Sequence, residues 1–148
     1  MANNSVTRRQ FTHSSLGSFL AAFALPSVSE GLSQSNSSTS SRREVTKQRL
    51  PGNPERQLTL VEIIYPPGTG SPPHVHANGV MAFVLSGSVA SKVGGEPERI
   101  FRSGEAWWEP PGATHRVSRN ASSSEEARLL AIYIAPFEAS ETDLMRPI

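Results

Sequence analysis

Three histidines of this chain have the spacing of metal ligands. His74 and His76 are separated by one residue, so on an extended segment both imidazole rings point to the same side. His115 follows a Pro-Pro-Gly turn that could place the start of its strand opposite the pair. Imidazole ligands suit iron, nickel, copper and zinc, and open positions on the ion would also admit manganese. The three residues therefore predict a site for one divalent metal ion.

The alternative is that these are ordinary surface or hydrogen-bonded histidines, which is the commonest fate of a lone histidine. Their placement reduces the weight of that interpretation. The chain has four histidines, and His13 lies in an N-terminal leader. The other three all lie at junctions between a turn and a strand. Taken alone, this placement leaves both interpretations open.

Composition limits the other chemistry that the chain can perform. Cysteine is absent, which excludes disulfides, thiolate ligands and cysteine nucleophiles, so a metal must be held by histidine, carboxylate or water. Without the two arginines of the leader, twelve basic residues face thirteen acidic ones, which gives a net charge near −1. No stripe of basic residues suggests nucleic acid or an anionic membrane as a partner. We expect a small-molecule ligand or substrate instead.

The elements that would position the histidines are short strands. The 148 residues suffice for one domain, and 12 prolines and 11 glycines interrupt the chain too often for long helices. Apolar and alternating runs predict strands at residues 58–65, 80–85, 89–93, 99–101, 105–109, 115–118 and 128–134. This spacing predicts an all-β sandwich or barrel. The run 58–65 is a candidate sheet edge, through which two copies could pair into a homodimer.

The N-terminal part of the chain is expected to lie outside the folded domain. Two arginines at positions 8 and 9 precede a ten-residue apolar stretch at 16–25, which is the order of a signal peptide and too short to cross a membrane. The Arg-Arg-x-Phe order is similar to a twin-arginine export signal, although Thr12 stands where a leucine is usual. An N-terminal amphipathic tail is the alternative. The predicted division is a signal peptide at 1–29, a disordered Ser-rich linker at 30–45 and a folded domain at 46–148.

Two motifs surround the histidines. The first is Gly68-x5-His74-x-His76-x10-Gly87, and the second is Gly104-x5-Pro110-x-Gly112-x2-His115-x4-Asn120. Together they resemble the two motifs of the cupin family. The resemblance implies a cupin-type jelly-roll β-barrel, with a metal site near its mouth that takes His74, His76 and His115 as ligands. It does not by itself imply a reaction.

The chain departs from the cupin pattern at Val80, where the first motif normally has a glutamate ligand. A site with three histidines alone would keep the +2 charge of the ion and leave more positions open to water or substrate. Glu109 could restore the carboxylate, because alternation along residues 105–109 puts it on the same side as Trp107. If that side is the interior, Glu109 is a fourth ligand, a partner of the ligands or a general base. Otherwise it is a carboxylate at the rim.

For other side chains near the motifs, the sequence indicates a functional role less strongly. Large aromatic residues would wall a pocket above the metal or, more commonly, fill the barrel core: Phe83, Trp107, Trp108 and Tyr133. Arg116 and Arg119 flank the second motif, where they would bind a substrate carboxylate or, more commonly, remain solvated.

The predicted function is that of an exported, periplasmic or extracellular cupin that binds one divalent metal ion. It would act on a small organic molecule as a dioxygenase-like oxidoreductase, an isomerase or a lyase, with Glu109 as the catalytic carboxylate. The alternative is a cupin that binds or senses a small molecule without catalysis. No stable membrane insertion is expected after the leader is removed.

Overall fold

The computed structural model describes residues 39–148. The predicted signal peptide and residues 30–38 of the predicted linker lie outside the described residues. Within residues 39–148, no helix is long and apolar enough to cross a membrane.

The described chain is built almost entirely of strands. In chain order they are β1 (Ser41–Leu50), β2 (Asn53–Tyr65), β3 (Gly70–Ser71), β4 (His74–Val75), β5 (Val80–Ser86), β6 (Ser88–Val93), β7 (Arg99–Arg102), β8 (Ala106–Glu109), β9 (Thr114–Asn120), β10 (Ala127–Pro136) and β11 (Arg146–Pro147). One short helix, α1 (Glu141–Leu144), lies between β10 and β11. Each run that the sequence predicted as a strand lies in or overlaps one of these elements, so the all-β prediction is confirmed.

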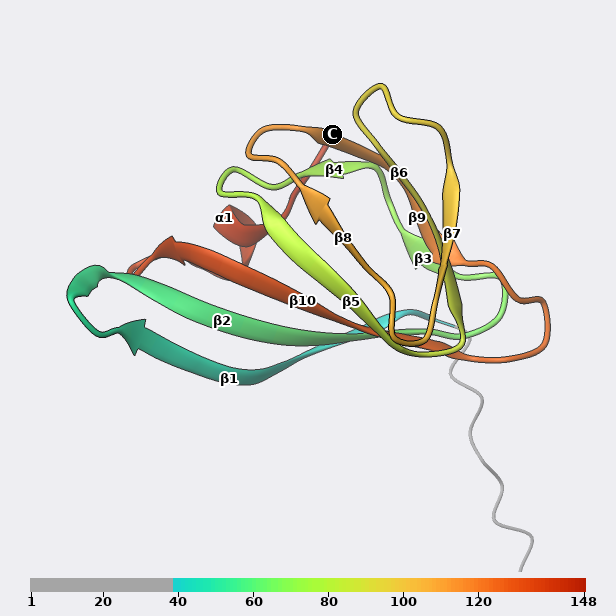
Figure 1. The fold of residues 1–148 in the computed structure, drawn as a ribbon, viewed down its shortest axis with the longest axis horizontal. Coiled ribbons are helices and arrows are strands. Elements are labelled where there is room, and N and C mark those ends of the chain that lie inside the picture. Colours follow the sequence, from blue (N-terminus) through green and yellow to red (C-terminus); the bar gives the residue numbers. More distant parts are fainter. Residues whose placement is uncertain (1–38) are drawn as a thin grey trace, which may run out of the picture. The chain divides into compact units, whose positions relative to one another are not determined.

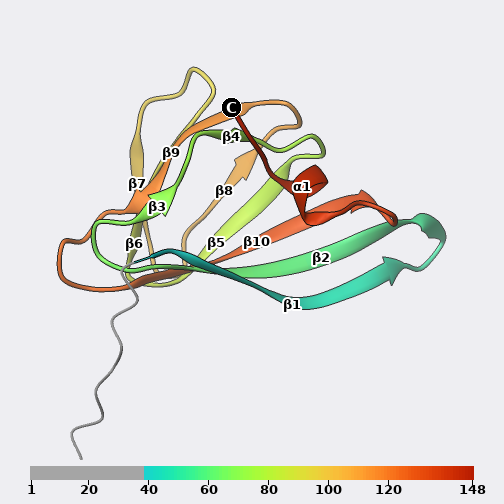
Figure 2. The same cartoon turned by 180° about the vertical axis from the view of Figure 1, so that it is seen from behind.

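The strands form two antiparallel sheets (Figures 1 and 2). One sheet has the order β1-β2-β10-β5-β8, and the other has the order β11-β4-β9-β6-β7, with β3 also paired to β9. Neighbours in each sheet are often distant in sequence, since β2 pairs with β10 and β4 with β9. Such long-range pairing brings the two histidine motifs onto adjacent strands.

The hydrophobic core lies on the inner faces of these sheets. Side chains alternate in and out along β2, β5 and β10, and most of the inward ones are apolar, with Gln57 and Thr59 of β2 as buried polar exceptions. The buried members of these three strands include Val61, Ile63, Val80, Ala82, Val84, Leu129 and Ala131. This core fixes the positions of the few polar side chains that share the inner face.

Two expectations about the N-terminal part of the domain are wrong. Residues 41–45, assigned to the disordered linker, belong to β1, so the domain begins earlier than residue 46. The run 58–65 is not a sheet edge, because β2 lies between β1 and β10. The edges of this sheet are β1 and β8. The homodimer therefore stays a prediction, without the edge on which it was based.

The C-terminal segment, residues 139–148, folds back onto the strand that carries His74. β11 pairs with β4, which places Pro147 opposite His74. The backbone N–H of Ile148 donates to the carbonyl of Pro73 at 3.1 Å. Leu144 of α1 is buried. In both views α1 lies between β10 and β4, so this segment covers one end of the structure.

Candidate metal centre

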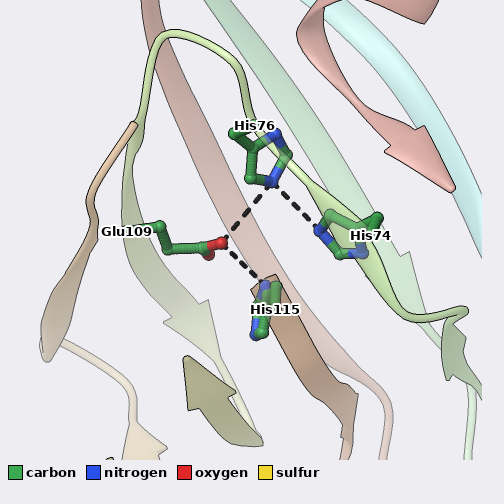
Figure 3. A group of neighbouring side chains, drawn as sticks. All are labelled: His74, His76, Glu109 and His115. Atoms are coloured by element: carbon green, nitrogen blue, oxygen red, sulfur yellow. Dashed lines mark hydrogen bonds and ion pairs between the residues drawn. The ribbon is translucent and has the colours of Figure 1, made fainter. Parts of the chain in front are cut away.

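The structure brings the three predicted histidines together (Figure 3). His74 lies directly opposite His115 in the pairing of β4 with β9. His76 follows two residues after His74, and its ring centroid lies 4.7 Å from that of His74. The three side chains are buried, at 3%, 4% and 2% exposure for His74, His76 and His115. Alternation along one strand and register with another thus place three imidazoles at one point.

Glu109 points into the same site. It is 3% exposed and shares the inner side of β8 with the buried Trp107, whereas Trp108 between them is exposed. The pairing of β5 with β8 places Glu109 directly opposite Val80. Residues opposite each other in an antiparallel pair point to the same face. The carboxylate that Val80 lacks is therefore supplied by the neighbouring strand.

Hydrogen bonds to the backbone fix the tautomers of two histidines. His74 Nδ1 lies 2.7 Å from the carbonyl oxygen of Pro72, and His76 Nδ1 is bonded to the carbonyl oxygen of Leu144. A carbonyl can only accept, so both Nδ1 atoms donate. In the neutral rings both Nε2 atoms then carry lone pairs, although they lie 3.0 Å apart. Two lone pairs at this distance repel each other unless a cation lies beside them.

The contact between Glu109 and His115 also brings two polar atoms close together without a hydrogen bond between them. Glu109 Oε1 accepts a hydrogen bond of 3.0 Å from the indole N–H of Trp107. Its Oε2 lies 2.8 Å from His115 Nδ1 and 3.5 Å from His76 Nε2. Yet neither Oε2 nor His115 Nδ1 has a partner in hydrogen-bond geometry. The remaining nitrogen of His115, Nε2, lies 2.9 Å from the hydroxyl of Ser91.

These observations fit a metal ion. One donor atom from each of the four residues lies within 4.8 Å of every other. The opposite ring nitrogens of the histidines bond to a carbonyl or hydroxyl oxygen, which is the arrangement that orients imidazole ligands in metal sites. Two of the donor atoms are buried without a hydrogen bond, which is costly in the absence of a cation. The cluster could hold one ion through three nitrogens and one carboxylate oxygen.

Burial sets the protonation of these groups. It lowers the pKa of His74 from 6.5 to about 4, against the opposing effect of the bond to Pro72. Burial also lowers the pKa of His76. For Glu109, burial favours the neutral form, but the neighbouring His115 and then His76 outweigh it and hold the pKa below its usual value. Near neutral pH, His74 and His76 are therefore neutral and Glu109 is charged, the forms that bind metal.

The metal-free protein is expected to lose stability as the pH falls from 7.5 to 5. The unfolded chain takes up a proton on His74 near pH 6.5, whereas the folded protein does so only near pH 4. Protons thus favour the unfolded state in this window, by about 2 kcal/mol at pH 5 for this residue. Urea unfolding of the metal-free wild type and of His74→Gln would measure the difference. An equal pH dependence of both proteins would contradict the assignment.

The space at the site is small. A cavity of about 20 Å³ is lined by the four clustered residues, by core residues such as Val80 and Leu129, and by polar side chains of β1, β2, β9 and β10. This volume suffices for about one or two water molecules. The buried Tyr65 hydroxyl bonds to Ser71 at 2.7 Å and to Ser118 at 2.9 Å. Burial raises the pKa of Tyr65, so the phenol is protonated.

The aromatic and arginine residues singled out in the sequence divide between the two sides of the sheets. Trp107 and Tyr133 line the cavity and also belong to the core, so both interpretations hold for them. Trp108 is 51% exposed, and Phe83 is half-buried on the same outer side of the sheet. Arg116 and Arg119 are exposed, and Arg119 pairs with Glu98 at 2.7 Å. None of these last four lines the cavity.

A larger hollow of about 410 Å³ lies elsewhere, beside α1. It is lined by Val75 and Ala77, which alternate with His74 and His76 and so face the other side of the strand. The hollow does not include any of the four clustered residues. The segment that carries His74 and His76 therefore separates the cluster from this hollow.

Comparison with known proteins agrees with this arrangement. Residues 61–133 match the family model described as cupin domain. The structure is similar to the DMSP lyase DddQ from Ruegeria pomeroyi DSS-3, with 20% identity, a TM-score of 0.55, and coverage of 68% of this chain and 49% of that one. Oxalate oxidase in complex with glycolate is 21% identical, with a TM-score of 0.55 and coverage of 72% and 55%. Comparison with curated proteins gives no match.

A third similar structure is close to this domain in size. It is an uncharacterized conserved protein with a double-stranded β-helix domain from Klebsiella pneumoniae subsp. pneumoniae MGH 78578, 21% identical, with a TM-score of 0.55 and coverage of 70% of this chain and 83% of that one. At these identities the likeness shows the fold, and the predicted cupin-type jelly roll is confirmed. This chain spans about half the length of the lyase and the oxidase.

Proposed function

We propose that the protein, of which residues 61–133 match the family model described as cupin domain, binds one divalent metal ion through His74, His76, His115 and Glu109. We propose that it acts there on a small organic molecule. The observation that carries the proposal is the meeting of buried lone pairs, with two histidine Nε2 atoms 3.0 Å apart. A single cation between the four donors removes that repulsion. Iron, manganese, nickel, copper and zinc are all compatible with the donor set.

The residues of the chain have distinct roles in this proposal. The carbonyls of Pro72 and Leu144 hold His74 and His76 with their Nε2 lone pairs toward the ion. Trp107 holds one oxygen of Glu109 and leaves the other for the ion. Four protein ligands leave room for a small molecule or water beside the ion, where a bound metal would polarise an oxygen ligand or activate oxygen. Glu109 as ligand takes precedence over Glu109 as general base, because its Oε2 lies among the ligand atoms.

The reaction class we propose is that of a metal-dependent oxidoreductase of the dioxygenase type, an isomerase or a lyase. The small cavity favours substrates of a few heavy atoms over flavonoids and other large aromatic compounds. Loading the untagged protein with each candidate metal and offering small keto acids and catechols under air tests this. Turnover that disappears on chelation is the expected result, and it should be greater for the small keto acids.

The second candidate function is a binding or sensing domain without catalysis. The observation that favours it is the size of the cavity, which at about 20 Å³ leaves little space for a reacting substrate. Metal-dependent binding of a small molecule, with no turnover by any metal form, would favour this candidate. Consistent absence of bound metal, together with failure to take up added ions, would contradict both candidates.

We also propose that the protein is exported by the twin-arginine route and works in the periplasm or outside the cell. The basis is the Arg-Arg-x-Phe order and the apolar stretch that follows it. Replacing Arg8 and Arg9 by lysine should retain the protein inside the cell, which fractionation would show. Unchanged export of the double variant would contradict the twin-arginine route.

A further inference from the structure

Arg42 of β1 stands where the metal cavity meets solvent. It is the one exposed residue among those that line the cavity. In the register of β1 with β2 it lies opposite the buried Ile63, which directs its side chain inward. Its Nη2 lies 3.4 Å from the hydroxyl of Tyr133, and its Nη1 contacts the sulfur of Met145 at 2.9 Å. A ligand that reaches the site from this side must pass the guanidinium group.

The hydroxyl group of Tyr133, which contacts Arg42, lies in the interior of the structure. The side chain is 1% exposed, and its ring centroid lies 5.4 Å from that of His76. Its hydroxyl group lies within reach of the Arg42 guanidinium group. The oxygen accepts from Arg42, which leaves the hydroxyl hydrogen available to a second acceptor. Arg42 and Tyr133 together therefore offer several donors and no charged acceptor.

The charges that line the cavity, together with a bound divalent ion, would favour an anionic ligand. Arg42 and Glu109 are the lining residues with a fixed charge, and they balance each other. A divalent ion held by neutral imidazoles would leave the lined space with a net charge near +2. An anionic ligand would offset this excess, whereas a neutral one would not.

We propose that Arg42 and Tyr133 recognise the carboxylate group of a small organic acid that binds at the metal centre. This inference rests on the proposed function, because the metal takes part in holding the acid. A carboxylate presents two oxygens in the plane that a guanidinium group matches. The cavity has about the volume of the waters that such a group would displace. The rest of the acid would extend past Arg42 toward solvent. Arg116 and Arg119, the arginines singled out in the sequence, do not line the cavity.

Cobalt(II)-loaded full chain titrated with acetate tests the inference, with the visible absorption of the cobalt as the readout. Acetamide is the matched neutral probe. Arg42→Met removes the guanidinium group and keeps an unbranched apolar stem, and Tyr133→Phe removes the hydroxyl alone. Arg49→Met is the control, because it removes the same charge from the same strand, where Arg49 stacks on Phe137 at 3.4 Å. Cobalt affinity is measured separately for each variant.

The wild type should bind acetate more tightly than acetamide. Arg42→Met should weaken acetate binding by at least about tenfold, with cobalt affinity changed little, and Tyr133→Phe should weaken it less. Arg49→Met should bind acetate like the wild type. Equal acetate affinities in the wild type and Arg42→Met, or no spectral response of the wild type to acetate, would overturn this inference and leave the metal site standing. A wild type that takes up no metal would overturn the proposed function and this inference with it.

Discussion

Moving the carboxylate of Glu109 to position 80 is expected to preserve metal binding, whereas deleting it is expected to weaken binding by at least about 100-fold. Glu109 and Val80 lie directly opposite each other on β8 and β5, on the same inner face. Both are almost fully buried, at 3% and 1% exposure. The double variant Val80→Glu/Glu109→Val therefore exchanges the carboxylate and the apolar side chain across one pair of strands. Metal titration of the single and double variants would measure the effect.

The outcome of this exchange separates a ligand from a structural carboxylate. If Glu109 binds the ion, the affinity of Glu109→Val should be low and that of the double variant should return to within about tenfold of the wild type. Glu96→Val, which removes an exposed carboxylate, is the control and should bind metal normally. Wild-type affinity in Glu109→Val would show that the three histidines suffice and that Glu109 has another role.

Metal is expected to stabilise the wild type strongly and His76→Ala not at all. An ion that binds only the folded state adds about 4 kcal/mol to the free energy of unfolding when its free concentration is 1,000 times Kd. His76 supplies one Nε2 donor to the cluster and also bonds through Nδ1 to Leu144 of α1. Its removal should therefore abolish the metal-dependent shift in Tm and loosen the C-terminal segment.

Thermal unfolding with added metal and with a chelator would measure this difference. Gln48→Ala, on the exposed strand β1, is the control and should keep the full metal-dependent shift. His76→Ala should unfold at the same temperature under both conditions. A metal-dependent shift of wild-type size in His76→Ala would place the ion elsewhere in the protein.

Much of the site could be predicted because it depends on local alternation. The period of two along an extended chain places His74 and His76 on one side, and it places Glu109 with Trp107 rather than Trp108. The structure shows both relations. The Pro-Pro-Gly turn before His115 leads into β9, where His115 lies opposite His74. To predict these relations, one needs to know only which residues form strands and that the strand of His74 pairs with the strand of His115.

Other features depend on contacts that leave no mark in a single sequence. β1 was missed because nearly all its side chains are exposed and polar, so it lacks the alternation that marks a half-buried strand. It is held by backbone pairing with β2. The contact of Arg42 with Tyr133 joins residues that are far apart in sequence. The carbonyl of Leu144, which orients His76, is a backbone group and has no residue type to reveal it.

The opposition of Val80 and Glu109 lies beyond what local patterns can establish. The sequence shows that the usual glutamate is absent and that another lies near His115. Only the register of β5 with β8 shows that the two positions are neighbours on one face. A shift of one residue in that register would have turned Glu109 to the outer face. The central claim is that Glu109 completes the ligand set in place of a glutamate at position 80. It therefore depends on a strand register that only the structure shows.

A crystal structure of the untagged protein, with diffraction recorded at the absorption edge of its bound metal, tests that claim most directly. One anomalous peak per chain is predicted among His74 Nε2, His76 Nε2, Glu109 Oε2 and a ring nitrogen of His115, at about 2.0–2.2 Å from each for an ion such as zinc. A peak coordinated by the histidines without Glu109 would contradict the four-ligand site. A metal-replete crystal with no peak among these residues would contradict the metal centre itself.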